Sequence, residues 1–426
     1  MLTKNISKII LFILLISTFS CSDQLDIFPQ DSIATEDLTS GDLESLLNGV
    51  YASFRNTYAD NGNSSLITDF DLLAGNFKTG PLFGASTFET HNIPTTDGYV
   101  EYVWSTIYAS IFDANILLEV IGDETGFEET ESSALYLRSL GYYWLVTRFG
   151  GVPLIESSSE TSNRRATEEE TWNLIIRDLN AALAKAPDFS GPNFVSKEAI
   201  MALLARVYLY VGDNAQALQM SQNVIDAGHF SLESDFSDIF SSNTSDELIF
   251  GFSNVEEFSR LTRIFTTNDH PNNGSQVYIP TDFALNDLFD PTDTRSEVSA
   301  ISFNNQPMVN KWANDPTASL IVSRLGEIYL INAEAQGFPG GIARLNQLRA
   351  IRGLAAVTPA DQAEFIDLII EERRKELYAE GFHFYDLVRT GKAIQEIPTI
   401  TSENQYLLPI PQREIDIEGY TQNPGY

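Results

Sequence analysis

Hydrophobic residues recur at steps of three and four along most of this chain, which is the spacing of one apolar stripe on an α-helix. The stripe is clearest over residues 195–211, and the pair Gly212–Asp213 then interrupts it. A second stripe follows over residues 214–227, and Gly228 suits the left-handed position that often ends a helix. Two helices joined by so short a turn form an αα-hairpin, so the pattern predicts helical hairpins as the basic unit.

A five-residue pattern of Leu, a small residue, two variable residues and an aromatic residue occurs three times. Its copies are Leu140–Gly141 with Trp144, Leu204–Ala205 with Tyr208, and Leu325–Gly326 with Tyr329. With Gly212 and Ala217, the middle copy keeps the order and spacing of a tetratricopeptide (TPR) repeat. The copies lie 64 and 121 residues apart, whereas a tandem array repeats at roughly 34 residues. We therefore expect helical repeats that are interrupted by insertions.

Several further helices have recognisable ends. Thr167 and Glu170 have the spacing of a capping box in front of a helix over residues 172–183. A second set of end signals is Thr358 as a cap, Pro359 in the first turn and Gly381 as the stop of a helix over residues 363–379. Other helices are expected over residues 41–54, 98–121, 130–148, 319–335 and 341–351.

Two stretches depart from the helical pattern. Residues 56–97 are rich in Gly, Asn, Thr and Phe, and residues 229–316 mix Asn, Asp and Ser clusters with short β-like runs such as 247–252. Structureless segments of this length are unusual in a compact protein and are often functional. The expected fold class is therefore mainly α, a TPR-like scaffold of helical hairpins with two loop-rich insertions and minor β structure.

The first residues have the layout of a secretory signal. Lys4 and Lys8 precede an unbroken apolar run over residues 9–16, which is too short to span a bilayer, and small residues follow it. The only cysteine, Cys21, stands at the expected cleavage point. This layout resembles a bacterial lipoprotein signal, which implies removal of residues 1–20 and acylation of Cys21. Such a protein is anchored to a membrane by lipid and does not span it.

Charge and composition exclude several classes of protein. The 426 residues include 59 acidic and 26 basic side chains, a formal net charge of −33. Nucleic-acid binding needs clustered Lys and Arg, and an anionic membrane surface would repel such a chain. A single cysteine excludes an intrachain disulfide framework and a thiolate metal cluster. The histidines, His91, His229, His270 and His383, have no metal-ligand spacing, so we expect no metal and no cofactor.

The motifs of common enzyme classes are absent from the sequence. The chain has no HExxH, no G-x-S-x-G, no phosphate loop and no dinucleotide fingerprint. A pair of carboxylates for glycoside hydrolysis stays open, because 59 acidic residues offer many pairs and no pattern singles out two of them.

Five blocks of sequence resemble the SusD/RagB family of Bacteroidetes outer-membrane lipoproteins. They are residues 102–119, 135–155, 324–334, 372–391 and 407–426. The most specific block, ERRKELYAEGFHFYDLVRTG at 372–391, is similar to the C-terminal signature of the family except at His383, where Arg is common. The resemblance implies one SusD-like domain over residues 21–426, with an N-terminal part over about 21–230 and a C-terminal part over about 231–426.

We expect most residues of these blocks to have structural roles. In the signature, the residues that alternate in sign at helical spacing are Glu372, Arg373, Arg374, Glu376 and Glu380. This spacing allows ion pairs along one face of a helix. The tryptophans that we expect to serve as core or structural residues are Trp104, Trp144, Trp172 and Trp312.

The resemblance implies binding without chemistry. A SusD-like lipoprotein of this family sits as a lid on a SusC-like TonB-dependent transporter, captures oligosaccharides and delivers them for import. The expected protein is therefore a lipid-anchored outer-membrane protein at the cell surface that binds oligo- or polysaccharide. One alternative is the same architecture binding oligopeptides, as RagB-type members do. A further alternative is an anchored hydrolase on a TPR scaffold.

Ligand residues of the family lie in variable loops, so residue type selects the candidates in the two insertions. Sugar rings pack their C–H faces on aromatic side chains, and their hydroxyls need amide or carboxylate partners. The candidates are Asn76, Phe77, Phe83 and Phe88 in the first insertion, and Asn268, Asp269, His270, Asn272, Asn273 and Tyr278 in the second. For each aromatic residue, burial under its own loop is the competing interpretation. The run Asp290–Arg295 (DPTDTR) also offers oxygen ligands for a cation, as a minor alternative.

Overall fold

The structure is a computed structural model that describes residues 38–59, 66–162, 164–254, 260–312, 315 and 317–426. The described residues divide into two units, 38–42 and 43–426. In the first unit, Ser40–Asp42 form a 3-10 turn (η3), and the hydroxyl of Thr39 donates a hydrogen bond to the carboxylate of Asp42 (2.9 Å).

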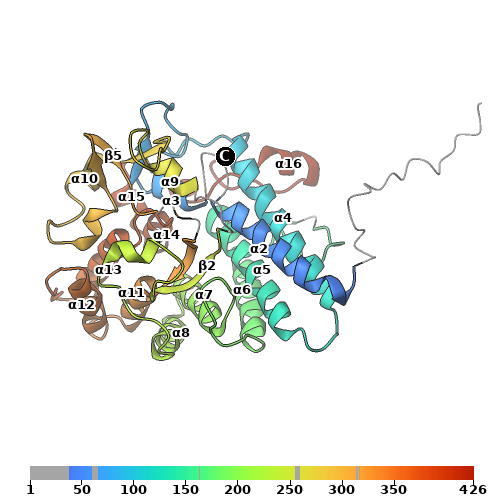
Figure 1. Cartoon of the computed structure of the whole chain (residues 1–426). Coiled ribbons are helices and arrows are strands. Elements are labelled where there is room, and N and C mark those ends of the chain that lie inside the picture. The colour runs from blue at the N-terminus through green and yellow to red at the C-terminus, as the bar shows by residue number, and fades with distance from the viewer. Residues whose placement is uncertain (1–37, 60–65, 163, 255–259, 313–314, 316) are drawn as a thin grey trace, which may run out of the picture. The chain divides into compact units, whose positions relative to one another are not determined.

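A series of helical hairpins forms the scaffold of the larger unit. Its helices are α2 (Leu43–Ala59), α4 (Gly98–Ile121), α5 (Glu128–Phe149), α6 (Glu168–Leu183), α7 (Lys197–Tyr210), α8 (Asn214–Asp226), α11 (Leu325–Gln336) and α12 (Ile342–Ile351). Each helix packs against the next one in this series. In Figure 1 they follow one another across the view, from α4 towards α12. The predicted class, mainly α with a TPR-like hairpin scaffold, is confirmed.

The repeated Leu–small–aromatic pattern marks the first helix of three hairpins, because its copies lie in α5, α7 and α11. The small residues allow the helices to approach closely. A Cβ atom added to Gly141 would lie 2.8 Å from Cγ1 of Ile111 in α4 and 3.3 Å from Cε1 of Phe54 in α2. Ala205 and Ala217 are fully buried where α7 meets α8. The interrupted repeats and the role of their small residues are therefore as predicted.

Local capping chemistry sets the ends of several helices. The hydroxyl of Thr167 accepts the backbone N–H of Glu170 (3.1 Å), and the carboxylate of Glu170 accepts the N–H of Thr167 (2.7 Å), so the predicted capping box is present. The side chains of Ser196 and Asp213 cap α7 and α8 by accepting the backbone N–H groups of Ala199 and Gln216. Gly228 takes a left-handed φ of 74° shortly after α8 ends, as its position predicted.

One predicted helix begins with a strand. The helix expected over residues 319–335 is β6 (Leu320–Arg324) followed directly by α11. β6 pairs antiparallel with β2 (Leu248–Phe252), which the β-like run in the second insertion predicted. A short apolar run fits a buried strand as well as a buried helix, so only the pairing with β2 decides its structure.

A second predicted helix has different ends. α13 (Gln362–Glu376) is capped by Asp361, whose carboxylate accepts the N–H of Glu364 (3.0 Å), and Thr358 is not its cap. The helix also ends five residues before Gly381, because a turn with Ala379 in the left-handed region (φ 64°) follows Glu376.

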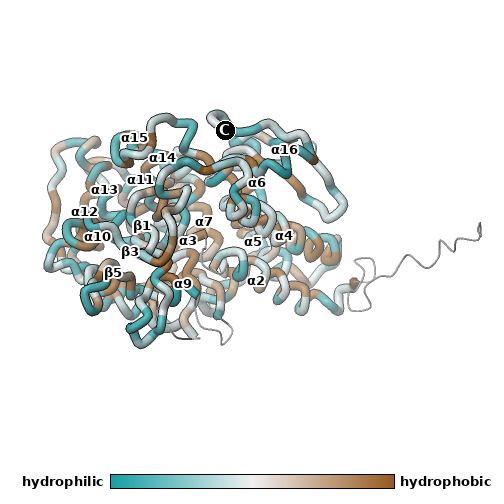
Figure 2. Tube along the Cα trace, turned by 90° about the horizontal axis from the view of Figure 1, so that it is seen from above, coloured by the Kyte–Doolittle hydropathy of each residue, from teal (hydrophilic) through white to brown (hydrophobic). Residues whose placement is uncertain are grey.

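The two insertions contain short helices and strands. The first holds α3 (Leu66–Leu73) and β1 (Phe77–Thr79). The second holds, besides β2, the elements η4 (Phe236–Phe240), α9 (Arg260–Phe265), β3 (Tyr278–Pro280), α10 (Asp282–Asn286), η5 (Thr294–Glu297), β4 (Ile301–Phe303) and β5 (Gln306–Met308). β1 pairs antiparallel with β3, and β4 pairs with β5. The β1–β3 pair joins the two insertions, and α3 and α9 lie beside it (Figures 1 and 2).

The main hydrophobic core runs through most of the scaffold helices and continues beneath the insertions, and a second, smaller buried cluster joins α11, α12 and α13. The four predicted core or structural tryptophans are all buried. Trp144, for example, stacks on Tyr58 of α2 with ring centroids 5.4 Å apart. The remaining C-terminal elements are α14 (His383–Arg389), α15 (Ala393–Glu396), η6 (Glu403–Tyr406) and α16 (Gln412–Glu418).

The close helix approach at Gly141 generates a first prediction. Gly141→Leu should lower the free energy of unfolding by about 1–3 kcal/mol, because the side chain must displace Ile111 and Phe54 in a packed interior. Gly49→Leu in α2 is the matched control, since a Cβ atom there meets nothing within 4 Å. Thermal and urea unfolding of both variants measure the difference. Equal stability of the two variants would contradict the packing argument.

Candidate functional site

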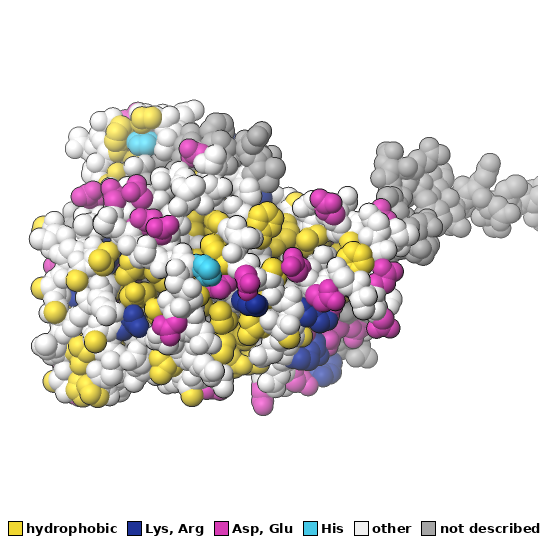
Figure 3. All heavy atoms as spheres, turned by 60° about the horizontal axis from the view of Figure 1, so that its bottom comes forward, with side chains coloured by type: hydrophobic (Ala, Val, Ile, Leu, Met, Phe, Trp, Pro, Cys, Tyr) yellow, Lys and Arg dark blue, Asp and Glu magenta, His cyan; other side chains and the backbone are white. Residues whose placement is uncertain are grey.

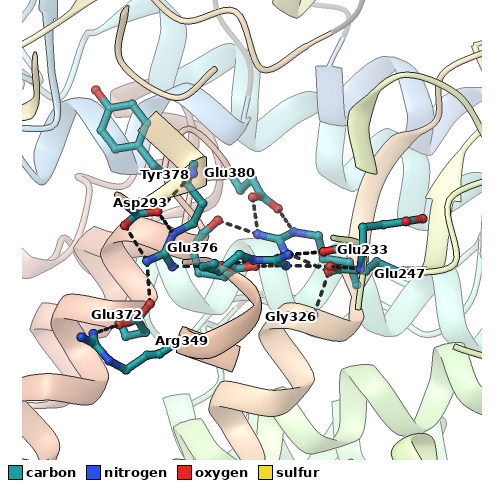
Figure 4. A network of polar contacts seen from close by, with 12 residues as sticks. Glu233, Glu247, Asp293, Gly326, Arg349, Glu372, Glu376, Tyr378 and Glu380 are labelled. Atoms are coloured by element: carbon teal, nitrogen blue, oxygen red, sulfur yellow. Dashed lines mark hydrogen bonds and ion pairs between the residues drawn. The ribbon is translucent and has the colours of Figure 1, made fainter. Parts of the chain in front are cut away.

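A buried set of ion pairs ties together the elements of the second half of the chain (Figure 4). We call it the central ion network, and its members are Glu247, Asp293, Arg295, Lys311, Arg324, Arg349, Arg352, Glu372, Glu376 and Glu380. These are five acids and five bases, so their formal charges cancel. Burial of charge is costly unless each group is paired and hydrogen-bonded, and this network satisfies both conditions.

Glu376 of α13 lies at the centre of the network. Its Oε1 accepts hydrogen bonds from Arg324 (2.7 Å) and Arg352 (2.8 Å), and its Oε2 accepts from Arg295 (3.0 Å) and again from Arg352 (3.1 Å). Burial raises the pKa of this carboxyl group, but the three guanidinium groups, led by that of Arg352, outweigh burial and hold the pKa well below its usual value. The carboxylate is therefore charged at neutral pH.

Glu380 extends the network beyond the end of α13. Arg324 binds it with two hydrogen bonds (2.9 and 2.8 Å), and the ammonium group of Lys311 donates a third (2.5 Å). Burial lowers the pKa of Lys311 to about 8. Arg324 thus links β6 to the turn after α13, and Lys311 links the segment after β5 to the same turn.

The C-terminal signature was predicted to form ion pairs along one helix face. For Glu372 and Arg373 this prediction is wrong, because their partners do not lie on the same helix. Glu372 pairs with Arg349 and Arg295, and Arg373 pairs with Asp386 (2.7 Å), so the partners lie on other elements. The reason is burial: these side chains point into the interior, where their partners must come from neighbouring elements. The assignment of the block to the scaffold is confirmed, because most of its charged residues are buried.

The carboxylate oxygens of the network are engaged by basic side chains. In the DPTDTR run, both carboxylate oxygens of Asp293 accept hydrogen bonds from Arg295 (2.8 Å each), so an arginine uses the oxygens that a cation would need. Within the described ranges, no group of three or more His, Cys, Asp or Glu side chains is placed to hold a metal ion. The ion pairs of the network connect β6, η5, α12 and α13.

Glu376→Gln should lower the free energy of unfolding by about 3–5 kcal/mol, because it removes one partner of buried arginines and leaves their charge uncompensated. Glu371→Gln on the exposed side of the same helix is the control, with an expected change below about 1 kcal/mol. Urea unfolding followed by circular dichroism measures both. A loss below about 1 kcal/mol for Glu376→Gln would contradict the central role of this residue.

The β1–β3 pair brings the loops of the two insertions together. The backbone N–H of Gly80, just after β1, donates to the carbonyl oxygen of Val277, just before β3 (2.7 Å). A Cβ atom on Gly80 would overlap the carbonyl oxygen of Gln276, so this approach requires glycine. Gln276 in turn donates to the carbonyl oxygen of Pro307 in β5 (2.9 Å). Three loops therefore meet, and we call their outer residues, 81–86, 268–273 and 302–306, the insertion surface.

Six of the predicted ligand residues lie on this surface. Phe83, Asn268, Asp269 and Asn273 are exposed, with 37% of Phe83 accessible, and His270 and Asn272 are half-buried. The ring of His270 contacts that of Phe303 edge-on, with centroids 4.8 Å apart. Burial lowers the pKa of His270, so its imidazole is neutral at neutral pH. Their assignment as ligand contacts stays a prediction.

The other four predicted ligand residues are buried. Phe77 packs on Phe265 and Tyr378 (5.1 and 5.2 Å between ring centroids), and Phe88 packs edge-on against Tyr99 (5.6 Å). The buried residues are Asn76, Phe77, Phe88 and Tyr278. For these side chains the competing interpretation, burial under the loops, describes their position, and they have no open face for a ligand in this structure.

The buried Asn76 has a supporting role at the start of β1. Its amide nitrogen donates to Asp71 (2.7 Å), and its amide oxygen accepts from Nε of Arg374 (2.8 Å). Asp71 also accepts the backbone N–H of Gly381 (2.9 Å). Burial raises the pKa of Asp71 to about 6. This residue therefore connects the first insertion to the C-terminal signature.

Three exposed or half-exposed residues of the insertion surface were missed from the sequence. Phe303 ends β4, and Asn304 and Asn305 form the turn to β5 with left-handed φ angles of 50° and 63°. The amide nitrogen of Asn304 donates to the carboxylate of Asp269 (2.8 Å), which places this turn against the second insertion loop. An Asn–Asn pair between two short β-like runs is a hairpin signal, so the sequence contained the information.

The insertion surface therefore combines amide groups, one carboxylate and apolar side chains on exposed loops. Hydrogen bonds from Thr267 and Asn304 lower the pKa of Asp269, so its carboxylate is charged and can accept hydrogen bonds. Phe83 and Leu82 add exposed apolar area, with 76% of Leu82 accessible. Such a set suits a ligand with both hydroxyl groups and apolar faces.

The part of the chain that the structure describes contains no helix long and apolar enough to cross a membrane. The predicted signal peptide, residues 1–20, and the predicted lipidation site, Cys21, lie outside the described residues.

Comparison with known proteins specifies the family to which this helical scaffold with its two insertions belongs. A family model described as "Starch-binding associating with outer membrane" matches residues 23–209, and a model described as "SusD family" matches residues 259–399. The chain belongs to the SusD/RagB family, as its sequence blocks predicted.

Individual relatives can be aligned with nearly the whole chain. A SusD-like protein of Formosa agariphila is 28% identical over 98% of this chain and 99% of its own length. The solved structure of a laminarin binding SusD-like protein has a TM-score of 0.77 and 27% identity, over 91% of this chain and all of that chain. A SusD superfamily protein from Parabacteroides distasonis has a TM-score of 0.80 at 21% identity, over 93% of this chain and all of that chain, and shares the fold.

Proposed function

We propose that this protein captures oligo- or polysaccharide at the cell surface and delivers it to a SusC-like TonB-dependent outer-membrane transporter. The insertion surface is the proposed capture site. The observation that carries the proposal is the meeting of three loops with exposed Phe83, Asn268 and Asn273 on a scaffold whose core is fixed by buried ion pairs.

The chemistry of the surface supports a neutral glycan. Exposed amides and the Asp269 carboxylate can bind hydroxyl groups, and the exposed aromatic ring of Phe83 can pack on the C–H face of a sugar. The net charge of −33 disfavours a polyanionic ligand. On the face in Figure 3, acidic side chains are also more numerous than basic ones.

The family supports the same class of ligand. One relative with 27% identity is described as laminarin binding, and one matching family model is described as starch-binding. Laminarin is therefore the first polysaccharide to test. The proposed mode of action is binding without bond cleavage, since Glu372, Arg373 and Glu376 of the signature are engaged in buried ion pairs of the scaffold.

Membrane attachment is part of the proposal. Residues 1–20 are removed as a signal peptide, and Cys21 is acylated, which anchors the protein to the outer membrane and leaves residues 21–426 as one SusD-like domain outside the cell. Several acyl chains hold a protein firmly, since each buried CH₂ contributes about 0.8 kcal/mol.

Affinity electrophoresis tests the capture site. The protein from Ser22 onward should be retarded in a gel that contains laminarin, and the double variant Phe83→Ala/Asn268→Ala should bind about tenfold more weakly, because it loses an aromatic platform and an amide partner. Ile417→Ala in α16 is the control, since Ile417 is exposed and lies outside the insertion surface.

Other outcomes of this experiment discriminate between functions. No retardation by laminarin or starch, together with peptides that co-purify with the protein, would replace the proposal with the peptide-binding alternative. Shorter sugar products after incubation with laminarin would favour the hydrolase. Equal retardation of the double variant and the control would move the binding site away from the insertion surface.

Metabolic labelling tests the anchor. Cells that express the full chain with radiolabelled palmitate should incorporate label into this protein, and Cys21→Ala should abolish the label and release the protein from the membrane fraction. Ser20→Ala, next to the cleavage point, is the control and should keep the label. A Cys21→Ala variant that stays in the membrane fraction would contradict lipid anchoring.

A further inference from the structure

A polar pocket lies at the end of the β1–β3 pair that is opposite to the insertion surface. Its volume is about 480 Å³, and it is lined by residues of α10, α13, α14 and α15 and of the segments beside them. Pockets for small ligands have volumes of about 300–1,000 Å³, so one sugar residue fits. Asn76 and Thr281 mark this end of the strand pair, since the N–H of Thr281 donates to the carbonyl oxygen of Asn76 (3.0 Å).

Arg374 lines the pocket without a carboxylate partner. Its Nε is held by Asn76 (2.8 Å), and its guanidinium group lies over the ring of Phe283, 4.8 Å from the centroid. Among the described residues it has no ion pair, and only Nε has a hydrogen-bond partner. The neighbouring Arg373, by contrast, is paired with Asp386. Arg374 is therefore a positioned donor whose terminal N–H groups have no hydrogen-bond partner among the described residues.

Phe283 gives the pocket an exposed aromatic wall. It lies in the short helix α10, directly after β3, and 47% of the side chain is accessible although it lines the pocket. The amide of Gln395 and the carboxylate of Glu396, both exposed, also line the pocket and belong to α15. An aromatic ring, a guanidinium group, an amide and a carboxylate together form a set of groups suited to a sugar ring.

The charges around the pocket select against charged ligands. Two of its four acids already have partners, because Asp367 pairs with Lys392 and Glu371 pairs with Lys375. Asp287 and Glu396 remain, and they would repel an anion that approached Arg374. A cation would meet Arg374 itself. A neutral polyol avoids both penalties, because its hydroxyl groups donate to carboxylates and accept from the guanidinium group.

His383 lines the same pocket at the position where the family signature commonly has Arg. It is buried, and its Nδ1 has no hydrogen-bond partner among the described residues. Burial, together with the nearby Arg374 and Arg373, holds the pKa of His383 well below its usual value, so the ring is uncharged. The substitution therefore removes a positive charge that Arg would place beside Arg374.

We propose that this pocket is a second binding site that holds a single neutral sugar residue, with Arg374 as hydrogen-bond donor and Phe283 as stacking platform. The inference rests on the proposed glycan-binding function for the identity of the ligand. The site differs from the insertion surface in position and residues, so one glycan chain or two separate chains can be held at two points.

Small sugars and site-specific variants test this pocket. In the double variant Phe83→Ala/Asn268→Ala, methyl β-glucoside and laminaritriose should still bind, as measured by saturation-transfer difference NMR and calorimetry. Adding Phe283→Ala should weaken this binding at least fivefold, and Arg374→Lys should weaken it as well, because Lys lacks the planar guanidinium fork. Ile394→Ala is the matched control, since Ile394 is exposed on α15 but does not line the pocket.

The outcomes separate this inference from the proposed function. Laminarin retention by the wild type without any effect of Phe283→Ala on small-sugar binding would overturn the second site and leave the capture function intact. Binding of methyl β-glucoside that depends on Phe283, in a protein that no polysaccharide retards, would support the pocket and remove the capture function. Binding of glucuronate or glucosamine in preference to neutral sugars would overturn the inference. Thermal unfolding of Phe283→Ala within about 2 °C of the wild type shows that the fold is intact.

Discussion

The C-terminal half of this protein depends on the ion pairs that the buried carboxylate of Glu376 forms with three arginines. Three guanidinium groups from β6, η5 and the end of α12 meet on its two oxygens, so its position fixes those elements relative to α13. Burying charged groups away from water costs free energy, and the cost is offset only when every partner is present. The network therefore acts as one unit, and this explains why the signature block contains acids at a spacing that turns them inward.

The central ion network also supports the loops of the two insertions. Glu380 and the turn after α13 lie against the first insertion, where Gly381 donates to Asp71, and Asn76 links Asp71 to Arg374. The β1–β3 pair starts from this point and carries the insertion loops at its far end. Loops that are to bind a ligand need such rigid support to keep their groups in position, and this is the role that we propose for the insertion surface. The same strand pair separates the two places where exposed aromatic and polar groups meet.

Sequence patterns predicted the parts of the fold that local physics decides. Long amphipathic helices such as α4 and α7, and the capping box of α6, follow from periodicity and from hydrogen bonds between near neighbours. β6 did not follow, because a short apolar run such as Leu320–Val322 fits a strand or a helix until its partner is known. The cap of α13 was also misplaced, because both Thr358 and Asp361 suit a cap and only the start of the helix selects one.

By itself the sequence determined the family, the hairpin scaffold and the two insertions that hold the candidate surface, because these depend on residue order and spacing. The tertiary structure alone decided which aromatic residues are exposed. Phe77 and Phe83 look alike in the sequence, yet one packs on Tyr378 and the other faces outward. It also decided that Glu372, Arg373 and Glu376 of the signature pair with residues of other elements and not along one helix face. Both are contacts between distant residues, and no local pattern records them.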